Sequence, residues 1–226
     1  RCGVEPEILV EVDEEKLVRR MVSDGADTTF FPNGGVALDY GQAFASLATD
    51  LRWLPSRLRA AGYETAAFSA MIQVSSLTGF ERGFDTFGEL FRDPEVAARC
   101  SERGQAERGA DYCLPLSEDV HERALRWLDL RRDARPFFLF LWSIDTHEPF
   151  RQPPRCNLDC DPAYRGPIDG RGRPFRRVRD ARDRRQVIDL YDGSLRYQDE
   201  QLGRLVEALR ARGVLDDTLL VVTGDH

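Results

Sequence analysis

The feature that most constrains the fold of this chain is a run of six apolar residues, FFLFLW, at positions 137–142. A strand with one face in water alternates apolar and polar side chains, but this run is apolar at every position. We therefore expect a strand in the centre of a sheet that helices cover on both faces. A second run, TLLVV at 218–222, has the same character and predicts a second buried strand.

Helical patterns lie between the predicted strands. Residues 54–61 predict a short helix, with Pro55 tolerated in its first turn and Gly62 as its stop. Residues 64–70 then predict a strand. Strands that alternate with helices are typical of a largely parallel sheet, so we expect an α/β fold with the layers of an α/β/α sandwich.

Two longer helices are predicted further along the chain. Ser117, followed by Glu118 and Asp119, predicts a capped helix start, and Gly213 marks the end of a helix over residues 186–212. The second helix should place one apolar face on the sheet near the last strand. The residues of that face are Ile188, Tyr191, Leu195, Leu202, Leu205 and Leu209.

Composition and charge narrow the class of protein. With 42% hydrophobic residues in 226 positions, the chain has enough apolar material for one sizeable core, so we expect one domain over residues 1–226. A net charge of -7 gives no general attraction to nucleic acid, and no apolar stretch reaches the length of a membrane span. The chain opens on Arg1 and ends directly after the predicted last strand, so we interpret the domain as incomplete.

Two unusual segments receive no assigned role. The cysteines, which include Cys156 and Cys160, are odd in number and form no Cys-x-x-Cys pair, so they support neither a disulfide framework nor a zinc ribbon. Residues 170–185 are rich in arginine, but Asp180 and Asp183 interrupt the series and no aromatic ladder accompanies it. A solvated loop is therefore the first interpretation. The alternative is that some of these arginines attract an anionic substrate to the mouth of a site.

Residues with metal-binding chemistry follow the second apolar run. Gly224 allows a sharp turn after the predicted strand, and Asp225 and His226 come directly behind it. Adjacent strand residues point to opposite faces, so this acid and imidazole converge on one ion only if the chain leaves extended geometry at Gly224. The alternative is a strand that ends in an ordinary polar turn.

The other candidate site lies just beyond the first apolar run, in the segment DTHEPF at 145–150. Open α/β sheets build their ligand sites at the carboxyl ends of their strands, so His147 is predicted to share one edge of the sheet with Asp225 and His226. An imidazole can hydrogen-bond an anionic ester oxygen or protonate a departing alkoxide. The alternative for His147 is a loop residue whose hydrogen bonds are already satisfied.

Several ordered segments resemble the sulfatase family of the alkaline phosphatase superfamily. They are LPSRLRAAGY at 54–63, TAAF at 65–68, GFERGFD at 79–85, residues 136–150, YDGS at 191–194 with Asp199, and residues 217–226. The likeness covers residues 47–226 and is weak over 1–46.

This resemblance implies an alkaline phosphatase-like fold and the hydrolysis of a sulfate ester of a small molecule or a glycan. It implies that Asp225 and His226 bind a divalent ion, with calcium as the first choice and manganese, magnesium or zinc as alternatives. It also implies that His147 contacts the sulfate or assists the leaving group.

One part of the family's pattern is not visible in this chain. Sulfatases carry two metal-binding acids and then a Cys-x-Pro-x-Arg or Ser-x-Pro-x-Arg motif, whose Cys or Ser becomes the formylglycine nucleophile. Cys2 has its proline at the wrong spacing, and Thr28, Thr29 and Ser46 have no local activating group, while the acids at 13–15 lie in a charged, helix-like stretch. We therefore assign no nucleophile and expect this stretch alone to be inactive. The alternatives to a sulfatase are a phosphodiesterase or phosphoglycerol transferase of the same superfamily and a non-catalytic binding relative.

Overall fold

The computed structural model describes residues 46–48, 50–102, 115–132, 134–148, 150, 160–170 and 177–224. Its helices are α2 (Leu54–Ala60), α3 (Pro94–Glu102), α4 (Ser117–Leu130) and α5 (Ala181–Ala211). Its strands are β1 (Glu64–Ser69), β2 (Thr86–Glu89) and β3 (Phe137–Trp142). Short 3-10 helices are η1 (Ser76–Thr78), η2 (Leu90–Arg92) and η5 (Leu215–Asp217).

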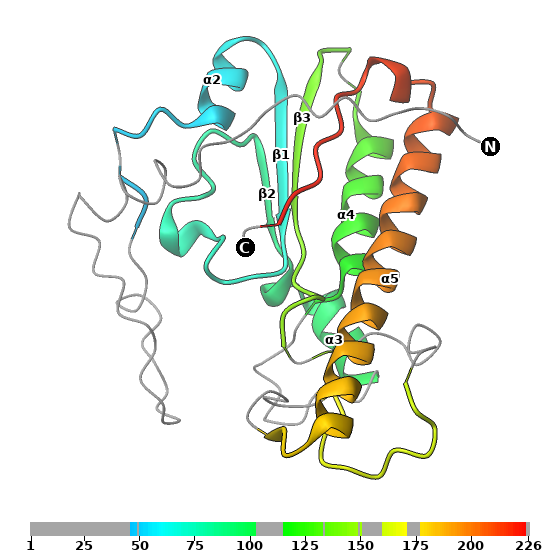
Figure 1. Cartoon of the computed structure of the whole chain (residues 1–226). Coiled ribbons are helices and arrows are strands. Elements are labelled where there is room, and N and C mark those ends of the chain that lie inside the picture. Colours follow the sequence, from blue (N-terminus) through cyan, green and yellow to red (C-terminus); the bar gives the residue numbers. More distant parts are fainter. Residues whose placement is uncertain are drawn as a thin grey trace.

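The described strands form one parallel sheet in the order β2-β1-β3 (Figure 1). Glu64 pairs with Phe137 at one end of the β1–β3 ladder, and Ser69 pairs with Trp142 at the other. Parallel neighbours need crossover connections. Helices α3 and α4 lie in the connection from β2 to β3, whereas the connection from β1 to β2 contains only the 3-10 helix η1. The prediction of an α/β fold with a largely parallel sheet is confirmed.

The short helix and strand predicted at the start of the sheet are also confirmed. Helix α2 begins with Pro55 in its first turn, and Gly62 follows it with φ +91°. A left-handed backbone of this kind favours glycine, which explains why the helix stops there. Strand β1 is the centre of the described sheet, and residues 65–69 are buried.

Helix α4 covers one face of this sheet. Its residues Val120 and Ala124 are fully buried and pack in one core with Ala66 and Phe68 of β1. The helix starts at the predicted residue, but Ser117 is not its cap. Instead, the Asp119 carboxylate accepts a 2.8 Å hydrogen bond from the backbone N–H of Leu116, the residue before the helix.

Strand β3 differs from its prediction in its place within the sheet. Every one of its residues is half-buried, and in the described sheet it pairs with β1 alone. Phe138 and Phe140 face Phe84, with ring centroids 6.0 and 6.3 Å apart, on the other face of the strand from Leu139 and Leu141, which pack with the α4 core. The expectation that β3 is a central strand is therefore wrong for the described part, because one edge of β3 has no neighbour there.

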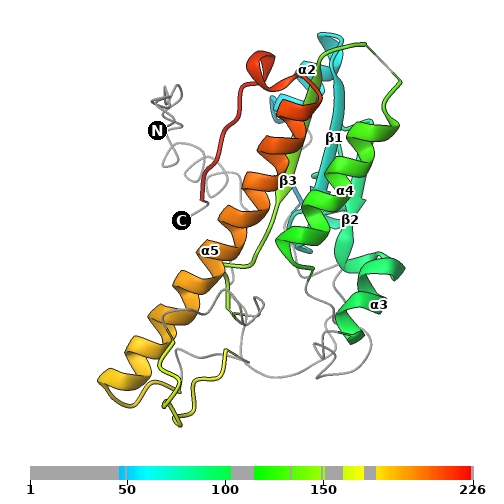
Figure 2. The ribbon, with the colours of Figure 1, turned by 90° about the vertical axis from the view of Figure 1, so that its right-hand side faces the viewer.

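The second apolar run forms no ladder with the described strands. Residues 218–224 run extended in the same direction as β3, on the β3 side of the sheet (Figures 1 and 2). Leu219 is 76% exposed and Val222 is 67% exposed, so the prediction of a buried strand at 218–222 is wrong for this structure. The run has the composition of a strand, but burial also requires a hydrogen-bonded neighbour and a covering layer.

Helix α5 begins earlier than predicted, because Asp180 caps it by accepting 2.9 Å hydrogen bonds from the backbone N–H groups of Arg182 and Asp183. Its end at Gly213, with φ +66°, is confirmed. Its predicted apolar face is buried only in part. Leu205 and Leu209 are buried and Leu202 is half-buried, whereas Ile188, Tyr191 and Leu195 are 44%, 40% and 44% exposed.

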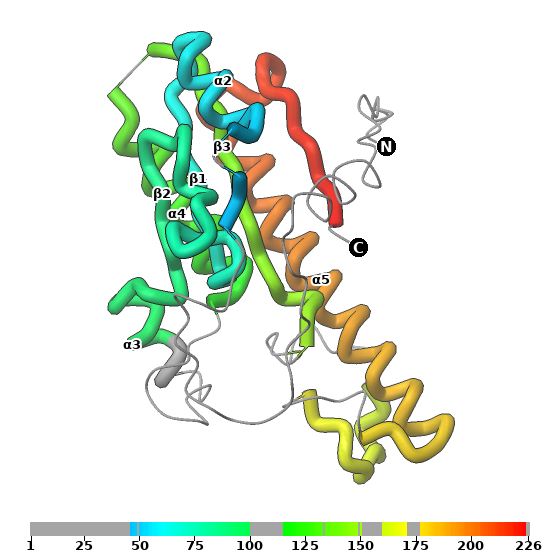
Figure 3. Tube along the Cα trace, turned by 90° about the vertical axis from the view of Figure 1, so that its left-hand side faces the viewer, coloured from blue at the N-terminus to red at the C-terminus, as the bar shows by residue number. Residues whose placement is uncertain are grey.

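The length of α5 explains this difference. Its 31 residues span about 46 Å at about 1.5 Å per residue, whereas a six-residue strand such as β3 spans about 20 Å. The carboxyl-terminal half of the helix packs beside α4, and the amino-terminal half extends past the sheet (Figure 2). There Val187 and Leu190 pack with Phe150 and Ile168 instead, in the neighbourhood of residues 160–170 (Figure 3).

None of the described helices combines the length and the apolar character that crossing a membrane requires.

Candidate functional site

The turn after β3 carries the first predicted site residue. The backbone N–H of His147 donates to the carbonyl of Ile144 over 2.9 Å, so the chain turns as soon as β3 has ended. The His147 side chain is exposed, and its Nδ1 lies 2.6 Å from the backbone carbonyl of Glu148. Because a carbonyl oxygen can only accept, Nδ1 carries the proton. A neutral His147 therefore presents the lone pair of Nε2 away from its own backbone.

The carboxyl group of Asp145 is buried two residues before His147. Asp145 is 5% exposed, and its Oδ1 accepts a 3.1 Å hydrogen bond from the backbone N–H of Ser117, the first residue of α4. Burial raises the pKa of Asp145 to about 6, while the Ser117 N–H and the Gln198 side chain act in the opposite direction. Gln198, on α5, also donates from Nε2 to the Ser143 hydroxyl over 3.0 Å. Two helices and the end of β3 thus meet around one carboxyl group.

A second histidine lies close to this junction. The Nδ1 of His121 is 2.7 Å from the carbonyl of Ser117, one helical turn earlier, and must donate to it. Burial lowers the pKa of His121, although the hydrogen bond to Ser117 opposes the shift. Burial therefore favours the neutral form of His121, and its hydrogen bond to Ser117 stabilises the first turns of α4.

Sequence reasoning missed the roles of both residues. Asp145 already stood in the segment singled out after β3, and a carboxylate directly behind a wholly apolar strand was the available signal. No sequence signal identified its partner Ser117, which lies 28 residues away. The spacing of four residues allows the His121 ring to hydrogen-bond the backbone carbonyl of Ser117 within a helix. Any helical residue stands four positions after another, so this spacing alone does not identify the contact.

The predicted metal ligands Asp225 and His226 lie outside the described residues, which end at Gly224. Their predicted convergence with His147 at one edge of the sheet therefore stays a prediction. Within the described ranges, no group of three or more His, Cys, Asp or Glu side chains is arranged to hold a metal ion.

The residues considered as nucleophiles remain without an assigned role. Ser46 is exposed near the beginning of the described residues. Cys2, Thr28 and Thr29 lie outside the described residues, as do the acids at 13–15.

The arginine-rich segment is only partly a loop, because residues 181–185 belong to α5 and residues 171–176 lie outside the described ranges. Carboxylates accompany four of its described arginines and compensate their charge locally. The ion pairs are Arg177–Asp169 at 3.5 Å, Arg179–Asp183 at 3.1 Å, Arg182–Asp161 at 2.9 Å and Arg185–Asp189 at 2.7 Å. Nearby, Cys160 packs against the cluster of Phe150 and Ile168, while Cys156 lies outside the described residues.

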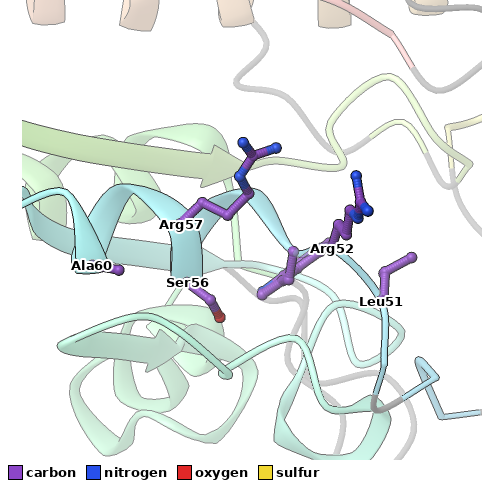
Figure 4. A pocket seen from close by; sticks show the side chains of 6 residues that line it. Leu51, Arg52, Ser56, Arg57 and Ala60 are labelled. Carbon is purple, nitrogen blue, oxygen red and sulfur yellow. The ribbon is translucent and has the colours of Figure 1, made fainter.

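An open groove of about 440 Å³ lies elsewhere, along α2. Its lining residues are Leu51, Arg52, Trp53, Ser56, Arg57 and Ala60. Arg52 and Arg57 extend to the same side of the helix, away from Ser56 and Ala60 (Figure 4). Helix α2 leads into the amino end of β1 and lies at the opposite end of the strands from the turn after β3 (Figures 1 and 3). The groove is therefore separate from the site around His147.

The sequence profile of the sulfatase family matches residues 21–226. This chain belongs to the sulfatase family. The match begins earlier than residue 47, where the resemblance between individual segments becomes clear, and it includes His147, Asp225 and His226. No curated protein matches the chain in a comparison of whole sequences.

One solved structure supports this fold. A phosphonate monoester hydrolase of Agrobacterium radiobacter is similar with a TM-score of 0.59 and 19% identity, over 83% of this chain and 49% of that one. A protein of the alkaline phosphatase superfamily from Vibrio parahaemolyticus has a TM-score of 0.35 and 15% identity, over 66% of this chain and 31% of that one. This sulfatase-family chain thus spans about half the length of the hydrolase and shares its α/β fold.

Proposed function

We propose that this sulfatase-family chain carries part of the active site of an enzyme that hydrolyses sulfate esters of small molecules or glycans. The observation that carries the proposal is the family match over residues 21–226, which includes all three proposed site residues. The exposed imidazole in the turn directly after β3 supports it, because α/β sheets place their ligands at this end of their strands.

In this proposal His147 is the general acid that protonates the leaving group. With Nδ1–H donated to the carbonyl of Glu148, Nε2 is the ring nitrogen that can carry a proton toward the substrate. When a nucleophile, which is not assigned within this chain, bonds to sulfur and the bond between sulfur and the ester oxygen breaks, the departing alkoxide takes the Nε2 proton and His147 returns to its neutral form. His147 also donates from Nε2 to a sulfate oxygen before the bond breaks.

Asp225 and His226 would hold a divalent ion. An aspartate oxygen and a histidine nitrogen fit such an ion in kind, and calcium, manganese, magnesium and zinc differ in how many oxygens they require. When bound, the ion supplies positive charge that stabilises an anionic oxygen of the substrate. Two protein ligands leave most of a coordination shell to other groups, so we expect the isolated chain to bind metal weakly.

The second candidate reaction is hydrolysis of a phosphonate monoester or phosphodiester. The observation that favours it is the fold similarity to a phosphonate monoester hydrolase, which has the higher TM-score of the two solved structures. At 19% identity this similarity shows the fold and leaves the substrate to experiment. Sulfate esters and these phosphorus esters each present a tetrahedral anion with an ester oxygen that leaves.

The test compares an aryl sulfate, an aryl phosphonate monoester and an aryl phosphodiester as substrates, with calcium or manganese, for residues 1–226 and for the natural full-length protein. We expect the full-length protein to prefer the sulfate and residues 1–226 to be inactive. His147→Ala and Asp225→Ala should each lower kcat/KM by at least about 100-fold, in line with loss of a proton donor or a metal ligand. Asp216→Ala, at an exposed position in the segment that precedes Asp225 in the sequence, is the matched control and should keep full activity.

Each alternative has its own outcome in this experiment. A preference for a phosphorus ester would replace the sulfatase proposal by the second candidate. Turnover by residues 1–226 alone would show that a nucleophile within them was overlooked. Full activity of the Asp225→Ala protein would refute the metal assignment, and inactivity of the full-length protein toward all three esters would favour a non-catalytic relative.

A further inference from the structure

The buried carboxyl group of Asp145 joins elements that are distant in sequence. Its Oδ1 accepts a hydrogen bond from the Ser117 N–H at the start of α4. The Gln198 side chain of α5 donates a hydrogen bond to the hydroxyl of Ser143, two residues before Asp145. Both helices are therefore attached to the last residues before the turn. The chain leaves β3 between two fixed points, one on each helix.

The same carboxyl group lies inside the turn that carries the exposed imidazole. The backbone N–H of His147 donates a hydrogen bond to the carbonyl of Ile144, so Asp145 and Thr146 are the two central residues of the turn. The orientation of Asp145 thus determines the path of the backbone that leads to His147. The next link is the bond from His147 Nδ1 to the Glu148 carbonyl, which depends on the backbone leaving the turn in this conformation.

Stability alone does not explain an acid at this position. The Oδ2 atom of Asp145 is buried without a hydrogen-bond partner among the described residues. A buried carboxylate in such surroundings carries a desolvation cost that an apolar residue of similar size would avoid. The N-terminus of α4 recovers part of that cost, because helix N-termini favour negative charge. What the acid adds is a directional attachment of the turn to α4.

We propose that Asp145 is a positioning residue for His147. Its hydrogen bond to Ser117 attaches the turn after β3 to the first residue of α4, and this attachment orients the His147 side chain. The inference rests on the proposed function of His147 as the residue that faces the substrate. It predicts that removal of the Asp145–Ser117 hydrogen bond releases the imidazole from its bond to Glu148 without unfolding the chain.

The three histidines of the chain make this prediction measurable by NMR of the whole protein with labelled imidazole rings. The nitrogen shifts of each ring report which nitrogen carries the proton. In the unchanged protein, His147 and His121 should both show the proton on Nδ1, since each donates to a carbonyl. The His121 signal then serves as an internal control for the folded start of α4, and thermal unfolding monitors the whole chain.

Two variants remove the proposed attachment from opposite sides. Asp145→Ala deletes the acceptor, and Ser117→Pro deletes the donor at the first position of α4, where proline is tolerated. Leu116 has an extended backbone, with ψ 165°, which a following proline accepts. In both variants we expect the His147 ring to lose its Nδ1–H preference and to show the mixture of tautomers of a free imidazole, while His121 keeps its signal.

Asp145→Asn is the conservative variant, because its side-chain oxygen can still accept from the Ser117 N–H. It should restore the Nδ1–H preference of His147. The proposal is overturned if either disruptive variant folds, keeps the His121 signal and leaves His147 unchanged, or if Asp145→Asn behaves like Asp145→Ala. If Asp145→Ala does not fold, Ser117→Pro and Asp145→Asn still decide the question.

The readout is separate from the reaction. If no ester is hydrolysed, or if His147→Ala keeps full activity, the proposed function fails while the tautomer of His147 still responds to Asp145. If instead the tautomer does not respond but His147→Ala abolishes activity, the positioning inference alone is wrong.

Discussion

Two leucines on α5 give a direct test of how this long helix packs. Leu205 and Leu195 belong to the same apolar face in the sequence, but Leu205 is 4% exposed in the structure and Leu195 is 44% exposed. Leu205→Ala and Leu195→Ala change the same residue type within one helix, so the difference in intrinsic helix propensity is equal for both. Any difference in unfolding free energy between the two variants therefore measures packing.

The expected magnitudes follow from burial. Leucine to alanine removes three carbon groups, worth about 0.8 kcal/mol each when buried, and the cavity raises the total for Leu205→Ala to about 3 kcal/mol. For the half-exposed Leu195 the same change leaves no closed cavity and should cost about 1 kcal/mol. In a protein of this size, 1 kcal/mol shifts the melting temperature by about 2–4 °C, so the expected losses are about 6–12 °C and about 2–4 °C.

Thermal and urea unfolding, followed by circular dichroism of the two variants and the unchanged chain, measures both quantities. The slope of free energy against urea should stay constant, which shows that the variants unfold to the same extent. Equal losses for the two variants would refute the packing described here. They would mean that the whole face is buried, as the sequence pattern alone predicts.

Two further predictions concern other parts of the structure. A Cβ atom at Gly88 would lie 2.6 Å from the Phe68 ring, so Gly88→Ala should lower the unfolding free energy by about 1–3 kcal/mol, whereas Gly203→Ala on α5 meets open space and should be neutral or stabilising by urea unfolding. The hydrogen bond from the Tyr164 hydroxyl lowers the pKa of Asp183 below its ordinary 3.8, so the stability that Asp183 contributes is present above that pH and is lost as the pH falls through the lowered value. Asp183→Asn should therefore flatten the fall in melting temperature below about pH 4, and an identical pH profile in both proteins would contradict this assignment.

The two apolar runs show what a sequence pattern can and cannot predict here. Both have the composition of a buried strand, and residues 137–142 do pair with β1 along their whole length. Residues 218–222 have the same character but no ladder with the described strands. Composition indicates that a segment tends to be extended and buried. Which strand it pairs with depends on the arrangement of the whole fold, and the segment's own residues do not determine this.

The candidate site likewise has one part that the sequence predicts and one part that it does not. His147 could be selected from sequence, because it directly follows a strand that its own residues predict. The attachment of Asp145 to Ser117 joins positions 28 residues apart, and no local pattern contains it. Likewise, the partial exposure of the apolar face of α5 depends on how far the helix extends beyond the sheet. The spacing of apolar residues along the helix does not contain this information.

Helix α5 has buried apolar residues near both of its ends, which has a consequence for local unfolding. Its first turns are held by Val187 and Leu190 against Ile168, and its last turns by the buried Leu205 and Leu209. Fraying that starts at Asp180 is therefore halted before it reaches the second set of contacts, and fraying from Gly213 is halted before it reaches the first. Gln198 lies between the two, so the α5 end of the junction with β3 is the stretch of this helix that opens last.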